Sequence, residues 1–63
     1  MNTKLRTAIF KEGLTQRDLA RKTKIHESFI SMAIRGKYNL DVVQKAKIAK
    51  ILNRPQEQIF TAN

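Results

Sequence analysis

Very few residues of this chain could take part in catalysis or metal binding. The 63 residues include a single histidine, His26, and no cysteine, which leaves neither a disulfide framework nor a thiolate zinc site. His26 stands at the start of an expected helix, where it serves as an imperfect cap or a backbone contact rather than as a catalytic base. No other acid–base or nucleophile set occurs in the sequence, so we expect no enzyme, no metal site and no cofactor.

The basic side chains are numerous enough to indicate a class of partner. Lysine and arginine number 13 against 5 aspartates and glutamates, which gives a net charge of +8 at pH 7. On so small a body this charge makes a strong positive field, whose natural partners are polyanions. Nucleic acid is the first candidate and an anionic membrane surface the second. A surface that is merely basic and soluble is the remaining alternative.

The length and the apolar pattern limit the architecture. A chain of 63 residues allows one small domain. Its apolar runs are a few residues long, far short of the roughly 20 needed to span a bilayer, and no apolar signal segment follows the basic N-terminus. We therefore expect a cytoplasmic, nucleoid-associated protein with no membrane partner and no small-molecule substrate.

Short helices are expected over nearly the whole chain, because glycine and proline are scarce and no useful strand alternation occurs. Thr15 and Asp18 form a capping box that opens one helix, and Asp41 and Gln44 form a second box. Residues suited to end helices in the left-handed conformation are Gly13, Gly36 and Asn53. The pattern predicts an all-α bundle of five helices, at residues 3–12, 15–23, 27–35 and 42–52 and from Pro55 onward.

Residues 16–35, QRDLARKTKIHESFISMAIR, carry apolar residues at the internal positions of a helix-turn-helix. Together with the flanking segments 13–16, 35–37 and 48–52, this span resembles the phage repressor and Cro family, also called the XRE-type helix-turn-helix family. The resemblance covers residues 5–60. It implies one domain over residues 1–63 with the five-helix lambda-repressor-like DNA-binding fold, the helix-turn-helix unit at about 16–35, and the third helix in the major groove.

The outer face of the third helix is the expected reading surface. If Ile30 and Ala33 point inward, the polar edge that starts at Glu27 points outward. By the resemblance, the base-contacting residues are Glu27, Ser28, Ser31 and Met32. Glu27 either accepts a hydrogen bond from cytosine N4 or only suits the helix dipole. Phe29 either meets a thymine methyl or folds back onto the fourth helix, and we favour the second.

Residues at the two ends of the unit are expected to hold the DNA backbone. In the family, the residue that matches Gln16 contacts a phosphate and braces the third helix. Donors after the third helix would position the protein rather than specify sequence, and Lys37 is the best single candidate. The full set of expected backbone contacts is Gln16, Arg17, Arg35, Lys37, Tyr38 and Asn39.

Two departures from the family pattern predict local structure. Lys24 occupies the turn position usually held by glycine, so we expect it to adopt the left-handed conformation at a cost on the order of 1 kcal/mol. Ile9 and Ile34 stand where some relatives place an arginine and a glutamate. We expect these two isoleucines to pack directly against each other in place of that ion pair.

The sequence thus predicts a sequence-specific double-stranded DNA-binding transcriptional regulator, a repressor of phage or bacterial type that occupies its operator as a homodimer. The dimer interface is expected in the C-terminal region, with Ile59 and either Phe60 or Tyr38, and Phe10 is another candidate. The alternative is a protein-interaction module that keeps the fold, as an antirepressor or antitoxin component would.

Overall fold

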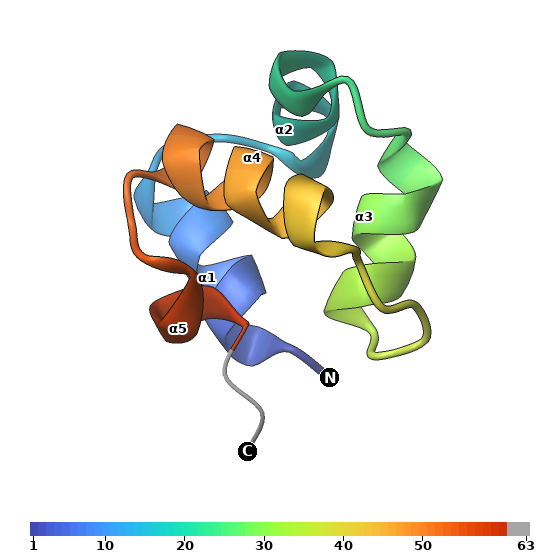
Figure 1. The fold of residues 1–63 in the computed structure, drawn as a ribbon. Helices are drawn as coiled ribbons and strands as arrows, with labels where there is room; N and C mark the ends of the chain where they lie inside the picture. The colour runs from blue at the N-terminus through green and yellow to red at the C-terminus, as the bar shows by residue number, and fades with distance from the viewer. Residues whose placement is uncertain (61–63) are drawn as a thin grey trace.

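The computed structural model describes residues 1–60 and, within them, contains five helices and no strand (Figure 1). The helices are α1 (Thr3–Lys11), α2 (Gln16–Thr23), α3 (Glu27–Ile34), α4 (Val42–Leu52) and α5 (Gln56–Ile59). The predicted all-α class is therefore confirmed. The expected ends of the helices hold to within one residue, and Pro55 stands just before α5 as its N-cap rather than inside it.

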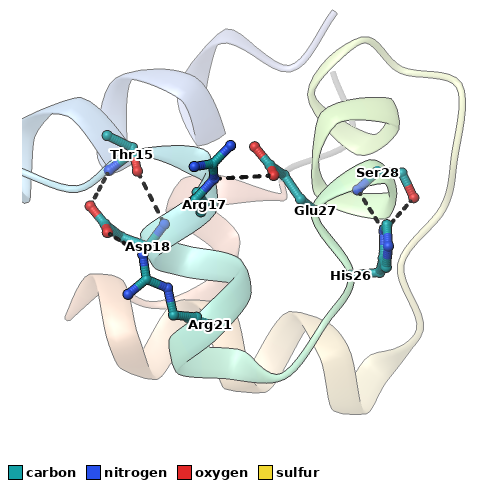
Figure 2. A network of polar contacts seen from close by, with 7 residues as sticks. All are labelled: Thr15, Arg17, Asp18, Arg21, His26, Glu27 and Ser28. Carbon is teal, nitrogen blue, oxygen red and sulfur yellow. Dashed lines mark hydrogen bonds and ion pairs between the residues drawn. The ribbon is translucent and has the colours of Figure 1, made fainter.

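Both predicted capping boxes are present and fix where α2 and α4 begin. The Thr15 hydroxyl accepts from the Asp18 backbone N–H at 3.1 Å, and the Asp18 carboxylate accepts from the Thr15 N–H at 3.0 Å (Figure 2). The pair of Asp41 and Gln44 makes the same reciprocal bonds at 2.7 and 3.0 Å. The backbone N–H and side chain of Thr15 hold the pKa of the Asp18 carboxyl below its usual 3.8, because they stabilise the ionised form.

The turn between α2 and α3 is set by one left-handed residue and one buried hydroxyl. Lys24 has φ 60° and ψ 28°, as predicted, so a lysine occupies a conformation that favours glycine. The buried Thr23 hydroxyl donates to the Leu19 carbonyl at 2.7 Å and accepts from the Ile25 N–H at 3.3 Å. These bonds direct the chain from the end of α2 into α3.

One apolar core joins all five helices. Its fully buried side chains are Leu5, Leu19, Ile30, Ile48, Leu52 and Ile59. Ile9 and Ile34 are each 4% exposed in the same cluster, so both positions are apolar and buried as the departure from the family pattern implies. Direct contact between these two side chains stays a prediction.

The expectation that Ile59 forms part of a dimer interface is wrong. Its side chain is 1% exposed and belongs to the core, because the single turn of α5 turns it inward to close the bundle against α1 and α4. Phe60 is half-buried and also packs against the core, with the Lys45 ammonium 5.6 Å from the centre of its ring.

Two polar contacts between distant parts of the chain hold the bundle together. Asn2 caps α1 by accepting from the Leu5 N–H, and its amide also donates to the Ile59 carbonyl at 2.9 Å. Arg54, just after α4, meets Glu12, just after α1, at 3.1 Å and also donates to the Leu52 carbonyl. Neither contact was predicted from the sequence.

Candidate nucleic-acid interface

α3 lies at the outside of the bundle and turns one edge away from the other helices (Figure 1). Its inner face contributes Ile30, Ala33 and Ile34 to the core. The four residues expected to contact bases are less buried than these inner residues. Ser28 is exposed, and the partly exposed residues are Glu27, Ser31 and Met32. An α-helix with such an open polar edge has the shape that a major groove of about 12 Å accepts.

An ion pair joins α2 to the beginning of α3. The Arg17 guanidinium reaches across to the Glu27 carboxylate, with 3.8 Å between Arg17 Nε and Glu27 Oε1 (Figure 2). The Arg17 side chain is 74% exposed and that of Glu27 45%, so the pair contributes little to stability. It does place a positive charge beside the carboxylate, which offsets the repulsion that this carboxylate would feel from a phosphate.

The N-cap of α3 is made by the chain's single histidine, as the sequence suggested. His26 Nδ1 accepts from the Ser28 backbone N–H at 3.1 Å, and the Ser28 hydroxyl lies 2.8 Å from the same nitrogen (Figure 2). Sequence reasoning identified the cap but missed the second contact, which couples the histidine to an expected base-reading side chain. The signal available in the sequence was a hydroxyl residue two positions after the histidine.

The loop after α3 carries most of the expected backbone contacts. Its backbone is tied to the helix by the Lys37 N–H, which donates to the Met32 carbonyl at 2.8 Å. Four of the six expected residues are exposed, namely Arg17, Arg35, Lys37 and Asn39, whereas Gln16 and Tyr38 are half-buried. Exposed donors therefore occur at Arg17 in the first turn of α2 and, along the chain after α3, at Arg35, Lys37 and Asn39.

Phe29 folds back onto the loop after α3, whereas we had favoured a position against the fourth helix. Its ring folds back onto Tyr38 of the following loop, with 4.9 Å between ring centres and 30° between planes. The His26 ring approaches from the other side, edge-on at 6.3 Å. Phe29 stays 38% exposed, so this aromatic group braces the loop against α3 and still presents apolar surface next to the reading edge.

The charge left over after internal pairing is strongly positive. Within residues 1–60, all three ion pairs use arginines, which are Arg17, Arg21 and Arg54. The lysines of the chain are not engaged in ion pairs in that range, so their field acts outward on a polyanion. Over the same residues no group of acidic, histidine or cysteine side chains is placed to hold a metal, and no helix has the length and apolar character needed to cross a membrane.

A capped helix, a left-handed turn and a second helix with an open polar edge define the class of helix-turn-helix domains. Residues 4–57 match the helix-turn-helix family, and the chain belongs to this XRE-type helix-turn-helix family. The resemblance seen in the sequence is thereby confirmed. This family consists of transcription regulators, typically without enzymatic activity, and membership supports a DNA-binding regulator.

A curated relative extends the match over nearly the full length. The chain is 35% identical over 60 residues to an uncharacterized HTH-type transcriptional regulator of Archaeoglobus fulgidus. The alignment covers 95% of this chain and 86% of the relative. No solved structure matches the chain.

Proposed function

We propose that this chain is a sequence-specific repressor that binds double-stranded DNA with α3 in the major groove. The observation that carries the proposal is the open polar edge of α3, with exposed donors before it in the chain, at Arg17, and after it, at Arg35, Lys37 and Asn39. A helix in the groove meets base edges with its outer side chains, while the flanking donors meet phosphates. Occupying an operator in this way would exclude or obstruct polymerase.

Base contacts and backbone contacts are assigned to different residues. We assign base reading to Glu27, Ser28, Ser31 and Met32, whose side chains line the open edge. Met32 supplies an apolar surface suited to a thymine methyl group. Positioning on phosphates is assigned to Gln16, Arg17, Arg35, Lys37, Tyr38 and Asn39. Gln16 is partly exposed at the first residue of α2, where its side chain and the free N–H groups of the helix can reach a phosphate together.

A homodimer on a palindromic site is the expected functional unit. One recognition helix reads only a few base pairs, and paired half-sites about one helical turn apart supply the rest. Phe10 is 81% exposed on α1 and is the strongest candidate for the contact between protomers. With Ile59 in the core, the large apolar side chain that the described part of the C-terminal region offers to such a contact is the half-buried Phe60.

Salt dependence tests DNA binding directly. A dimer making about 6–10 phosphate contacts predicts that log K falls against log[salt] with a slope near −5 to −9. Lys37→Ala removes one phosphate contact from each protomer, so it should weaken binding to all duplexes alike and make the slope for the dimer shallower by about 2. The matched control is Lys11→Ala, an exposed lysine at the end of α1 that should leave the slope unchanged. A flat salt dependence would contradict the proposal.

A protein-interaction module is the second candidate, because the surface carries large apolar groups. Besides Phe10, Val42 and Val43 at the start of α4 are 76% and 62% exposed. A partner held by such groups would bind with little salt dependence. Phe10→Ser separates the two candidates: as a dimer contact it lowers DNA affinity and shifts the chain toward monomer, whereas as a partner site it leaves DNA binding unchanged.

A further inference from the structure

We infer that the first turn of α3 selects bases by their amino groups, because Glu27 and Ser28 both act there as hydrogen-bond acceptors only. The inference rests on the proposed DNA-binding function and gives it a base preference. It assigns adenine or cytosine, rather than guanine or thymine, to the two bases that these side chains face. His26 is the positioning residue that fixes the polarity of Ser28.

The proton arrangement of His26 follows from a single bond. A backbone N–H can only donate, and that of Ser28 lies 3.1 Å from His26 Nδ1. Nδ1 must therefore carry a lone pair and no proton, which leaves the imidazole proton on Nε2. The histidine cap of α3 and the neutral Nε2–H form of the ring require each other.

The direction of the Ser28 hydroxyl then follows. Its oxygen lies 2.8 Å from the same unprotonated Nδ1, and at that distance two facing lone pairs would repel each other. The hydroxyl proton must point at the ring nitrogen, so Ser28 Oγ donates to His26. Because a serine hydroxyl has one proton and two lone pairs, only acceptor capacity remains on the exposed side.

Glu27 adds a second acceptor next to the first. Its ionised carboxylate has no proton to donate, and the Arg17 guanidinium lies 3.8 Å away. The side chain is 45% exposed, so the carboxylate remains available to an external donor while Arg17 holds it. Two consecutive residues at the leading end of α3 thus present acceptors without donors.

The major groove supplies complementary groups on only two bases. Adenine N6 and cytosine N4 are amino donors, whereas guanine offers only the acceptors N7 and O6, and thymine offers O4 and a methyl group. An acceptor-only side chain facing guanine or thymine would meet lone pairs. An unconstrained serine could rotate its proton toward those acceptors, so the histidine converts a tolerant contact into a selective one.

Selection of bound duplexes from a random pool, with four proteins, tests the inference. The Ser28→Ala variant identifies the base position that Ser28 contacts, because the base preference should be lost at that position and kept at the others. At that position the unmodified chain should favour adenine or cytosine over guanine or thymine by at least about five-fold. His26→Gly, which keeps a residue tolerated at N-caps but removes the acceptor, should reduce this ratio toward one. His26→Asn, which restores an acceptor oxygen, should preserve it.

Stability and the free protein supply independent controls. Thermal melting should show that His26→Gly remains folded, since glycine at an N-cap costs little relative to the preferred residues. In the free protein at about pH 8, the nitrogen chemical shifts of His26 should report a proton on Nε2 and none on Nδ1. The opposite tautomer would overturn the inference even if DNA binding were intact.

The remaining outcomes distinguish a failure of the inferred base preference from a failure of the proposed DNA-binding function. Enrichment of guanine or thymine at the Ser28 position, or an unchanged preference in His26→Gly, would overturn the inference and leave the DNA-binding proposal standing. The same holds if Ser28→Ala changes no position. A pool with no enriched sequence, together with no binding at low salt, would overturn the proposed function and this inference with it.

Discussion

Shortening Ile34 to alanine is expected to remove a large part of the stability of this domain. Ile34 is 4% exposed and lies at the end of α3 within the core cluster that also contains Ile9. Replacing a buried isoleucine by alanine costs about 2–5 kcal/mol, through lost burial and the cavity left behind. A domain of 63 residues has a total stability of about 3–9 kcal/mol, so the loss is about a fifth of the total or more.

Chemical denaturation followed by circular dichroism measures the effect. Ile34→Val is the graded companion and should cost about 0.5–1.5 kcal/mol, which keeps the order of effects measurable if the alanine variant does not fold. A loss below about 0.5 kcal/mol for Ile34→Ala would refute the packing described here. Pairing valine substitutions at Ile9 and Ile34 in a double-mutant cycle tests direct contact, since residues that do not touch give effects that add to within about 0.5 kcal/mol.

Substitutions at three further positions test the turn between α2 and α3, the contacts of Asn2 and the pH dependence of stability. Lys24→Gly should leave the free energy of unfolding unchanged or raise it by up to about 1 kcal/mol, because relief of the left-handed strain opposes the greater freedom of the unfolded chain. Lys24→Val should lower the free energy of unfolding. A glycine variant clearly less stable than the parent would contradict the left-handed geometry. Asn2→Ala should lower the free energy of unfolding by about 0.5–2 kcal/mol, because the helix cap is lost. Asn2→Ser keeps the cap but not the bond to the Ile59 carbonyl, so its melting temperature should lie between those of the parent chain and Asn2→Ala. The Asp18 pKa is lowered in the folded state, so the stability that this carboxylate contributes is complete above pH 3.8 and is lost as the pH falls through the lower folded value. Asp18→Asn should therefore be less stable than the parent at neutral pH, with a gap that narrows in denaturation curves below pH 3.8, and a gap independent of pH would count against the assignment.

Local signals in the sequence were sufficient to predict the elements of this fold. Thr15 and Asp18 mark the beginning of α2 because a capping box needs only two residues three positions apart. Lys24 could be assigned a left-handed conformation because the turn of the unit demands it. Such features depend on neighbours in the chain, so they can be predicted without knowledge of the tertiary contacts.

Contacts between distant segments could not be predicted in the same way. Asn2 and Ile59 are 57 positions apart, and Arg54 and Glu12 are 42 positions apart. Ile59 was expected in a dimer interface, and its place in a short terminal helix does not reveal which way its side chain faces. Only the packing of α5 against α1 and α4 turns that side chain inward.

The candidate interface shows the same division. The resemblance to the family assigned base-contacting roles to residues along α3, and the structure leaves the edge that carries them open to a partner. The contacts of those side chains could be seen only in the folded structure. Arg17 contacts Glu27 from another helix, and the Ser28 hydroxyl contacts His26 Nδ1, which the sequence analysis had assigned to the helix cap alone. The chemistry of each reading group therefore depends on neighbours that its sequence position does not reveal.

Mapping amide chemical shifts during titration of the isotope-labelled chain with a short duplex tests the central claim most directly. The account predicts that the largest shift changes fall on residues 27–37, with smaller ones at Gln16 and Arg17 and little change around Phe10, and that raising the salt concentration reverses them. Shift changes concentrated on α1 and α5, or none at low salt, would contradict the claim that the outer edge of α3 is where this protein meets DNA.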